Sequence, residues 1–225
     1  MATYDGEWAA NYARRADAAI PGREGLYRLC RAFLTQLPPR SDVLVVGAGT
    51  GEELFALARS LPDARFVAIE PAEPMLAHCA HRVADEGLGE RIALRAETLD
   101  AFVPTRAFDA ATSILVSQHV VPDDAAAAFF GKLAALLRPG GLLFTADAHV
   151  AAGQDRQLLL ASWRRQAVMS GIEPTLADGM LARIGVDPAL RDEARIVALL
   201  EGAGFEEVQK VFGSLIYGAW SARRR

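Results

Sequence analysis

The chain has 225 residues, of which 52% are hydrophobic and 23% are charged, and its formal net charge is −4. The mildly acidic balance argues against a nucleic-acid partner, because phosphate contacts need clustered basic residues. No apolar run is long enough to cross a bilayer, and the first residues lack the pattern of a signal peptide. With two cysteines that show no metal or disulfide spacing, we expect a cytoplasmic protein with reduced thiols. The four histidines show no metal-ligand pattern, so no metal site is expected.

Residues 1–40 predict an N-terminal helical cap that is interrupted at Pro21 and Gly22 and ends before Pro38 and Pro39. Strands and helices then alternate, which predicts an open parallel sheet covered on both faces. The predicted strands are 43–46, 65–69, 92–95, 108–115 and 142–146, and the predicted helices are 52–60, 74–86 and 123–137.

The alternation stops after the fifth predicted strand. The next region is mainly helical, and we interpret 150–190 as a helical insertion over the site at the sheet edge. A helix at 191–203 and a hairpin of strands at 208–212 and 215–222 follow, and such a hairpin can pair with the open edge of the sheet. The terminal arginines 223–225 are interpreted as a short solvated tail. Without repeats or low-complexity linkers, one domain is expected over 1–225.

The segment 43–54, with sequence VLVVGAGTGEEL, predicts a buried strand, a tight glycine turn and a helix start. Glycine at Gly47 and Gly49 permits positive φ and leaves room for a ligand beside the main chain. Dinucleotide enzymes carry a third glycine where Glu52 stands, and a carboxylate there repels a pyrophosphate. The lysine of a phosphate-binding P-loop is also absent. The turn therefore favours an uncharged or cationic adenosine derivative and argues against a nicotinamide dehydrogenase.

Acidic residues follow the next two predicted strands. Glu70 stands at the tip of the second strand, about 20 residues beyond the turn, where a carboxylate commonly accepts hydrogen bonds from a ribose diol. An exposed loop carboxylate is the alternative. Glu97 and Thr98 follow the third strand, where the carboxylate can accept from an adenine amino group. An exposed charge at Glu97 fits the spacing almost equally well.

These motifs, in this order, resemble class I S-adenosylmethionine (SAM)-dependent methyltransferases. The resemblance also covers Met75-Leu76 and the segments 108–111 and 137–141, and extends over nearly the whole chain. It implies an α/β, Rossmann-like, seven-stranded mixed sheet whose last strand is antiparallel. It also implies that SAM binds over the tips of the first strands, and the cationic sulfonium suits the acidic turn.

The resemblance assigns cofactor-binding roles residue by residue. The residues expected around the methionine part of SAM are Gly47, Ala48, Gly49 and Thr50. Those expected around the ribose are Glu70, Pro71 and Met75, and those beside the adenine are Glu97 and Thr98. Ile114, or its neighbours Ser113 and Leu115, supplies backbone near the sulfonium.

A closer similarity concerns segments 19–22, 117–122 and 212–222, which resemble the branch containing carboxy-SAM synthase, an enzyme that serves tRNA wobble-uridine modification. The chain departs from that branch at two places. The tyrosine that follows Pro-Gly there is Arg23 here, and the arginine that pairs with the extra carboxylate is replaced near Met180, with Arg183 close but not clearly equivalent. Ordinary SAM and methyl transfer are therefore expected, with the carboxy-SAM or tRNA-related chemistry kept as the alternative.

His119 is the predicted catalytic residue. It follows the fourth strand, where this family places acceptor-facing groups, and imidazole titrates near neutrality, which suits a general base. Gln118 can orient an acceptor, and His149 is a weaker candidate for the base. Packing beneath the insertion or exposure to solvent is the structural alternative for these side chains. Trp163, Met169 and Met180 are expected to shape an apolar acceptor pocket. Trp8 and Tyr12 lie on one face of the first helix and can close over SAM or the acceptor, although packing in the core is the favoured interpretation for Trp8.

The sequence thus predicts a SAM-dependent methyltransferase that acts on a small-molecule acceptor. A non-catalytic SAM-binding protein is the alternative of a different class. It would keep the glycine turn and Glu70 but lack a cleft open to an acceptor. A homodimer is the expected assembly because members of this family often pair, although no residue of the sequence specifies it.

Overall fold

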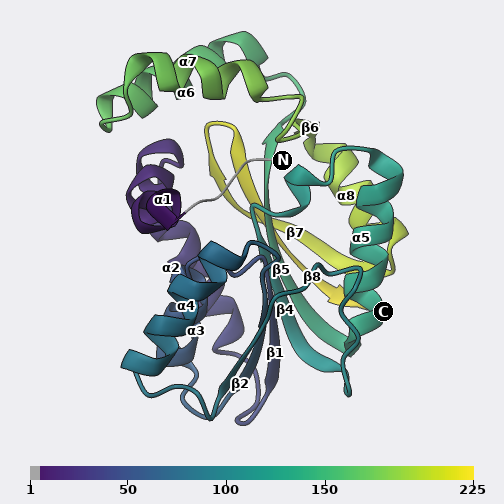
Figure 1. The fold of residues 1–225 in the computed structure, drawn as a ribbon. Coiled ribbons are helices and arrows are strands. Elements are labelled where there is room, and N and C mark those ends of the chain that lie inside the picture. Colours follow the sequence, from purple (N-terminus) through teal and green to yellow (C-terminus); the bar gives the residue numbers. More distant parts are fainter. Residues whose placement is uncertain (1–5) are drawn as a thin grey trace.

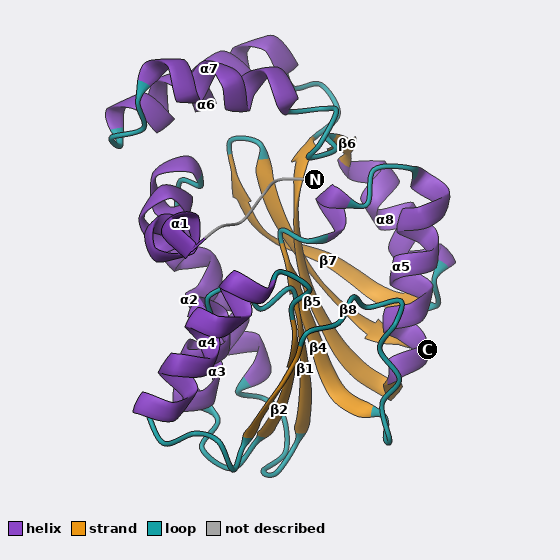
Figure 2. Cartoon of the chain, viewed as in Figure 1, coloured by secondary structure: helices purple, strands orange, loops and turns teal. Residues whose placement is uncertain are grey.

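The computed structural model describes the backbone of residues 6–225 and the side chains of residues 12–225. A twisted sheet lies between two helical layers (Figures 1 and 2). The strands follow the spatial order β3-β2-β1-β4-β5-β8-β7. Their bounds are β1 Asp42–Val46, β2 Arg65–Ile69, β3 Ile92–Arg95, β4 Phe108–Ile114, β5 Leu137–Val150, β7 Phe205–Ser214 and β8 Tyr217–Arg224.

The first five strands pair in parallel, and β8 runs antiparallel to both β5 and β7. The predicted mixed sheet of seven strands with an antiparallel last strand is therefore confirmed. The terminal hairpin does pair with the sheet, and its last strand inserts between β5 and β7. An additional two-residue strand, β6 (Arg191–Asp192), pairs with β5 outside this path.

The sheet register brings the carboxyl ends of three strands together. Val46, the last residue of β1, lies beside Ile69 of β2 and Ser113 of β4. All five residues of β1 are buried, as expected for a strand covered on both faces. In parallel α/β sheets this end, where the strand order reverses, is where ligands bind.

Helices cover both faces of the sheet. On one side lie α2 (Arg23–Leu34), α3 (Glu52–Ser60) and α4 (Glu73–Asp85), and on the other lie α5 (Asp123–Leu136) and α8 (Glu193–Gly202) (Figure 1). Three more helices lie at the carboxyl ends of the parallel strands: α6 (Arg156–Met169) and α7 (Pro174–Arg183) lie beyond the strands, and α1 (Gly6–Ala19) lies on the side of α2 and α4 (Figure 2). They share an apolar cluster that includes Ala16 and Trp163.

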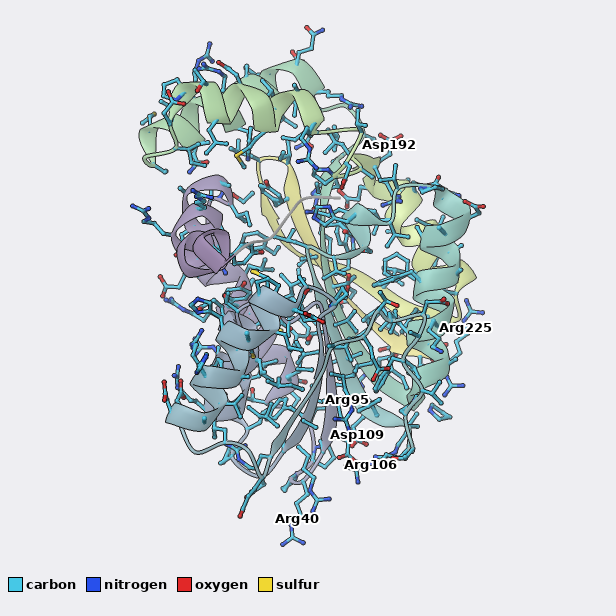
Figure 3. The ribbon with its side chains drawn as sticks, viewed as in Figure 1. Arg40, Arg95, Arg106, Asp109, Asp192 and Arg225 are labelled. Carbon is cyan, nitrogen blue, oxygen red and sulfur yellow. The ribbon has the colours of Figure 1, made fainter. Side chains whose placement is uncertain are left out.

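The amino ends of the strands carry a network of charges. Arg106 Nη2 lies 2.7 Å from Asp42 Oδ1, and the backbone N–H of Asp42 donates to Asp109 Oδ2 at 2.8 Å. Arg138 pairs with the other oxygen of Asp109. Figure 3 shows Arg106 and Asp109 at the end of the sheet opposite Asp192. These charges pair with one another at the amino ends of the strands.

Three sequence predictions about local structure are wrong. Residues 191–192 form β6 rather than the start of the last helix, because the strand pairs with His149 and Val150 of β5. The fifth strand is much longer than 142–146, because Leu137 pairs with Phe108 of β4, and pairing with β8 and then β6 carries the strand on to Val150. The terminal arginines are not a solvated tail: Arg224 belongs to β8 and donates to the carbonyl of Leu137, and the backbone of Arg225 donates to that of Gly204.

Two further observations concern residues 6–225. Within this range no helix has both the length and the apolar character needed to span a bilayer. The described residues also hold no group of three or more His, Cys, Asp or Glu side chains suited to a metal ion. The side chain of Trp8 lies outside the described residues, so its predicted packing stays a prediction.

Candidate functional site

The predicted glycine turn connects β1 to α3 and is held tightly. Gly47 has φ of +70° and Gly49 has φ of +54°, so both adopt the left-handed conformation expected from the sequence. The N–H groups of Gly47 and Ala48 both donate to the carbonyl of Ile69, at 2.9 and 3.1 Å. A Cβ added at Gly47 would lie closer than 3.0 Å to Val116 Cγ2. The turn therefore requires glycine at position 47 on two grounds, conformation and space.

Glu70 lies against this turn. Its Oε2 accepts a hydrogen bond from the N–H of Gly49 at 3.0 Å, and its Oε1 accepts from the N–H of Ala72 at 2.9 Å. Burial raises the pKa of the carboxyl group, and these two hydrogen bonds oppose that rise. Met75 approaches the same point, because its Cε lies 3.5 Å from where a Cβ on Gly49 would stand. The structure thus brings together three predicted cofactor-binding residues, from the connection after β1, the connection after β2, and α4.

The other predicted cofactor residues surround the same strand tips. Ala48 and Thr50 are buried in the turn, Ile114 is buried at the end of β4, and Pro71 is exposed after β2. Glu97 is half-buried after β3. Thr98 begins a turn there, because its Oγ1 accepts from the N–H of Ala101 at 3.3 Å.

The chemistry of this region fits an adenosine cofactor. Each oxygen of Glu70 accepts one hydrogen bond and has a second lone pair, so the carboxylate can also accept from a ribose diol. Gly49 exposes backbone without a side chain. Within the described residues, the buried hydroxyls of Thr50 and Ser113 have no hydrogen-bond partner, and both lie where the methionine part and the sulfonium are expected.

A cavity of about 220 Å³ opens beside the cofactor region. Residues from six elements or their connections line it, among them Tyr12, Leu115, Gln118, His119, Trp163 and Tyr217. Its walls are largely apolar and aromatic, and Met180 of α7 also contributes. Trp163 is fixed by a hydrogen bond from its Nε1 to the carbonyl of Ala19 at 2.8 Å. The cavity therefore has a rigid aromatic wall and a few polar groups, as small-molecule sites usually do.

The predicted base His119 faces this cavity and pairs with a carboxylate. Its Nδ1 lies 2.7 Å from Asp187 Oδ1, and its Nε2 lies 3.4 Å from Gln118 Nε2. The amide of Gln118 is oriented because its Oε1 accepts from the N–H of Ala148 at 3.0 Å. Gln118 Nε2 is therefore a donor, so His119 Nε2 is the acceptor and Nδ1 carries the proton given to Asp187. In this tautomer the unprotonated Nε2 accepts from Gln118, and an acceptor hydroxyl bound in the cavity would take the place of that amide as the donor.

The loop that carries His119 is fixed by Arg191. This side chain, only 8% exposed, donates to the carbonyls of Ser117, Val120 and Val121, and pairs with Asp123 at 3.0 Å. Arg191 thereby joins β6 to the loop of residues 117–121, which carries His119.

Behind that loop, the hydroxyl of Ser117 donates to Asp147 Oδ2. Burial raises the pKa of the Asp147 carboxyl group to about 7, although the bond from Ser117 opposes the rise. Asp147 is therefore a buried acid of β5 that holds Ser117, and with it the loop that carries His119, by a hydrogen bond.

Sequence reasoning missed Asp187, which stands 68 residues from His119 in a loop with no recognisable motif. It also misplaced Met169, which is 87% exposed rather than part of a pocket.

His149 does not line the cavity. It is buried against Trp220, with ring centroids 5.2 Å apart, and burial lowers its pKa to about 4. Trp163 and Met180 do line the cavity, as predicted.

Comparison with known proteins supplies the deciding observation. A family profile described as "Methyltransferase domain" matches residues 44–143, which contain the glycine turn, Glu70 and His119. Nocamycin O-methyltransferase of Saccharothrix syringae is 32% identical over 208 residues, which cover 89% of this chain and 72% of that protein. The chain belongs to the class I SAM-dependent methyltransferases. The resemblance inferred from the sequence is thus confirmed for the family, and the nearer likeness to the carboxy-SAM synthase branch stays a prediction.

Solved structures share the fold of this methyltransferase. The mitomycin 7-O-methyltransferase MmcR has a TM-score of 0.64 at 18% identity, over 88% of this chain and 53% of that chain. Human N-acetylserotonin methyltransferase, in complex with SAM, has a TM-score of 0.64 at 16% identity, over 91% of this chain and 52% of that chain. The methyltransferase therefore spans about half the length of these two proteins. SAM is the cofactor of this family.

Proposed function

We propose that this methyltransferase transfers a methyl group from SAM to a hydroxyl group of a small molecule bound in the cavity. The observation that carries the proposal is the His119–Asp187 pair, which lines a largely apolar cavity whose wall residue Tyr12 approaches Gly49. A hydroxyl acceptor needs a base, because its oxygen becomes a good nucleophile only as the proton leaves. The O-methyltransferase relative supports oxygen over nitrogen or carbon as the acceptor atom.

Each group of the site has a defined part in this reaction. SAM, when bound, supplies a methyl group attached to a cationic sulfonium; when the bond between sulfur and methyl breaks, the sulfur becomes a neutral thioether. His119 Nε2 accepts the acceptor's hydroxyl proton while the new O–C bond forms, and Asp187 holds the imidazole in the required tautomer and stabilises the imidazolium. The aromatic wall with Trp163 orients the acceptor and excludes water, which is the main contribution of an enzyme to in-line displacement.

The cofactor-binding residues remain those expected from the family resemblance. The proposal assigns the ribose hydroxyls to Glu70 and the methionine part to the backbone of residues 47–50. The geometry supports this assignment because Glu70 and Met75 both meet Gly49 at the strand tips. Glu97 and Thr98 are proposed beside the adenine, and Ile114 near the sulfonium.

Two alternatives are disfavoured by particular contacts. A carboxy-SAM synthase needs a cation for the additional carboxylate, whereas Arg183 lies 3.5 Å from Asp187 in an ion pair of the described structure. A non-catalytic SAM-binding protein would lack a cleft for an acceptor, whereas a cavity opens beside the cofactor region. Ordinary methyl transfer therefore accounts for more of the site than either alternative.

The test uses methyl-labelled SAM with a panel of phenols and aliphatic alcohols, followed by a small-molecule extract. We expect label in at least one hydroxyl compound with the wild-type protein and a loss of at least 100-fold with His119→Ala, within the usual contribution of a general base. Measurable SAM binding by calorimetry without label transfer to any compound would favour the non-catalytic alternative. Transfer of a carboxymethyl rather than a methyl group would favour the carboxy-SAM alternative.

The single-domain organisation, the homodimer and the cytoplasmic location complete the proposal. The two cysteines support a reducing compartment, because both Cys30 and Cys79 are buried free thiols. Sedimentation of the purified protein will decide between monomer and dimer.

A further inference from the structure

Gln118 lines the cavity next to the proposed base and is held through both its main chain and its side chain. It is only 7% exposed. Its carbonyl accepts from the N–H of Ala189 at 2.7 Å, and its Oε1 accepts from the N–H of Ala148 at 3.0 Å. The amide nitrogen therefore has a fixed place beside the imidazole of His119, and it cannot turn away without breaking the bond from Ala148.

This amide competes with the acceptor for one lone pair. A neutral imidazole has a single acceptor nitrogen, so His119 Nε2 can serve one donor at a time. In the structure that donor is Gln118 Nε2 at 3.4 Å, while Nδ1 gives its proton to Asp187. In the proposed reaction the acceptor hydroxyl has to donate to Nε2, so it displaces the amide. The acceptor thus enters the site at the cost of the bond between Gln118 and His119.

The displaced amide nitrogen needs a new partner, because a buried N–H group without a hydrogen bond is unfavourable. The cavity is largely apolar, and Leu115 and Trp163 are among the residues that line it. The molecule bound in the cavity lies directly beside the displaced amide. An oxygen on that molecule, next to the hydroxyl that reacts, would accept from Gln118 Nε2 and restore the lost hydrogen bond.

We propose that the acceptor carries a second oxygen on the atom next to the one that bears the methylated hydroxyl, as in a catechol, and that Gln118 selects it. The inference rests on the proposed role of His119 as the base. One oxygen gives its proton to His119 Nε2 while its bond to the methyl carbon forms and the sulfur–methyl bond breaks, and the other accepts from Gln118 Nε2.

The spacing of the two nitrogens supports this substrate class. Oxygens on neighbouring ring carbons stand about a hydrogen-bond length apart, which is close to the 3.4 Å between the two nitrogens. Each oxygen can therefore face one nitrogen in a nearly straight hydrogen bond. Oxygens in meta or para positions lie farther apart and would splay the two bonds, which weakens them. Gln118 is thus a specificity-determining residue for acceptors with adjacent oxygens.

The test compares three isomers that differ only in the position of the second oxygen: catechol, resorcinol and hydroquinone. Methyl-labelled SAM is the donor, and kcat/KM is measured for each isomer. The wild-type protein should prefer catechol by roughly 10-fold or more, as expected for a buried donor that is otherwise left without a partner. In Gln118→Met, which keeps the side-chain length but removes the amide, kcat/KM for catechol should fall by roughly 10-fold and that for resorcinol by less than about threefold. Gln36→Met, at an exposed glutamine, is the matched control and should keep the wild-type preference.

Equal kcat/KM for the three isomers in the wild-type protein would overturn the inference, and so would a preference for catechol that survives in Gln118→Met. Should Gln118→Met fail to fold, the wild-type series decides alone. If label enters only compounds of a small-molecule extract, the position of the methyl group decides, because a methylated oxygen with no oxygen on the adjacent atom contradicts the proposal. Label transfer to no compound at all would overturn the proposed function instead, so the two failures are distinguishable.

Discussion

Substituting alanine for Gly47 tests whether the turn is built as the structure shows. The new methyl group meets two costs. A non-glycine residue at φ of +70° costs about 1–2 kcal/mol. A Cβ closer than 3.0 Å to Val116 Cγ2 costs about 1–3 kcal/mol more, because the valine side chain is stiff and cannot turn away. Gly47→Ala should therefore lower the free energy of unfolding by about 2–5 kcal/mol.

A double-mutant cycle separates the two costs. Val116→Ala removes the clashing methyl groups, so the combination with Gly47→Ala should recover about 1–3 kcal/mol as coupling energy and leave the conformational cost. Gly89→Ala is the matched control, since a Cβ there meets no atom within 4 Å. Its effect should stay within about 0.5 kcal/mol. Urea unfolding measures the wild type and these four variants. A loss below about 1 kcal/mol in Gly47→Ala, or no coupling to Val116, would refute this account of the turn.

Three other predictions concern the site. Glu70→Ala should weaken SAM binding by about 1–3 kcal/mol, the cost of a lost buried hydrogen-bond partner, and unchanged affinity in calorimetry would remove Glu70 from the site. Asp187→Asn should lower turnover while SAM affinity stays, because the amide carries no charge to stabilise the imidazolium and its NH2 group can hold the imidazole in the wrong tautomer. Equal turnover of this variant and the wild type would end the proposed role of Asp187.

The third prediction concerns Asp147, whose pKa in the folded protein is about 7 and lies above its ordinary value of 3.8. Between pH 3.8 and about 7, the folded protein therefore keeps a proton on this carboxyl group that the unfolded protein releases. The free energy of unfolding should therefore fall as the pH rises from about 4 to about 7, relative to Asp147→Asn, and parallel pH profiles for the two proteins would contradict this.

Local signals in the chain were sufficient for most of the fold. The bounds of β2, β3 and α3 match those predicted, because each is a periodic apolar segment with clear turn residues at its ends. The family also followed from the sequence, since the glycine turn and Glu70 are defined by short-range spacing. Residues 191–192 were predicted as helix and form a strand because pairing with β5 outweighs local propensity.

The sequence by itself determined the parallel sheet, the glycine turn, the cofactor family and His119 as the candidate base. Each depends on residues close together in the chain, where spacing carries the information. Only the tertiary structure decided that Asp187 pairs with His119, that Arg191 fixes the loop that carries His119, and that Arg23 lies behind Tyr12 near the turn. These contacts join residues on elements whose relative positions follow from packing of the whole chain. No local pattern specifies which distant side chains will meet.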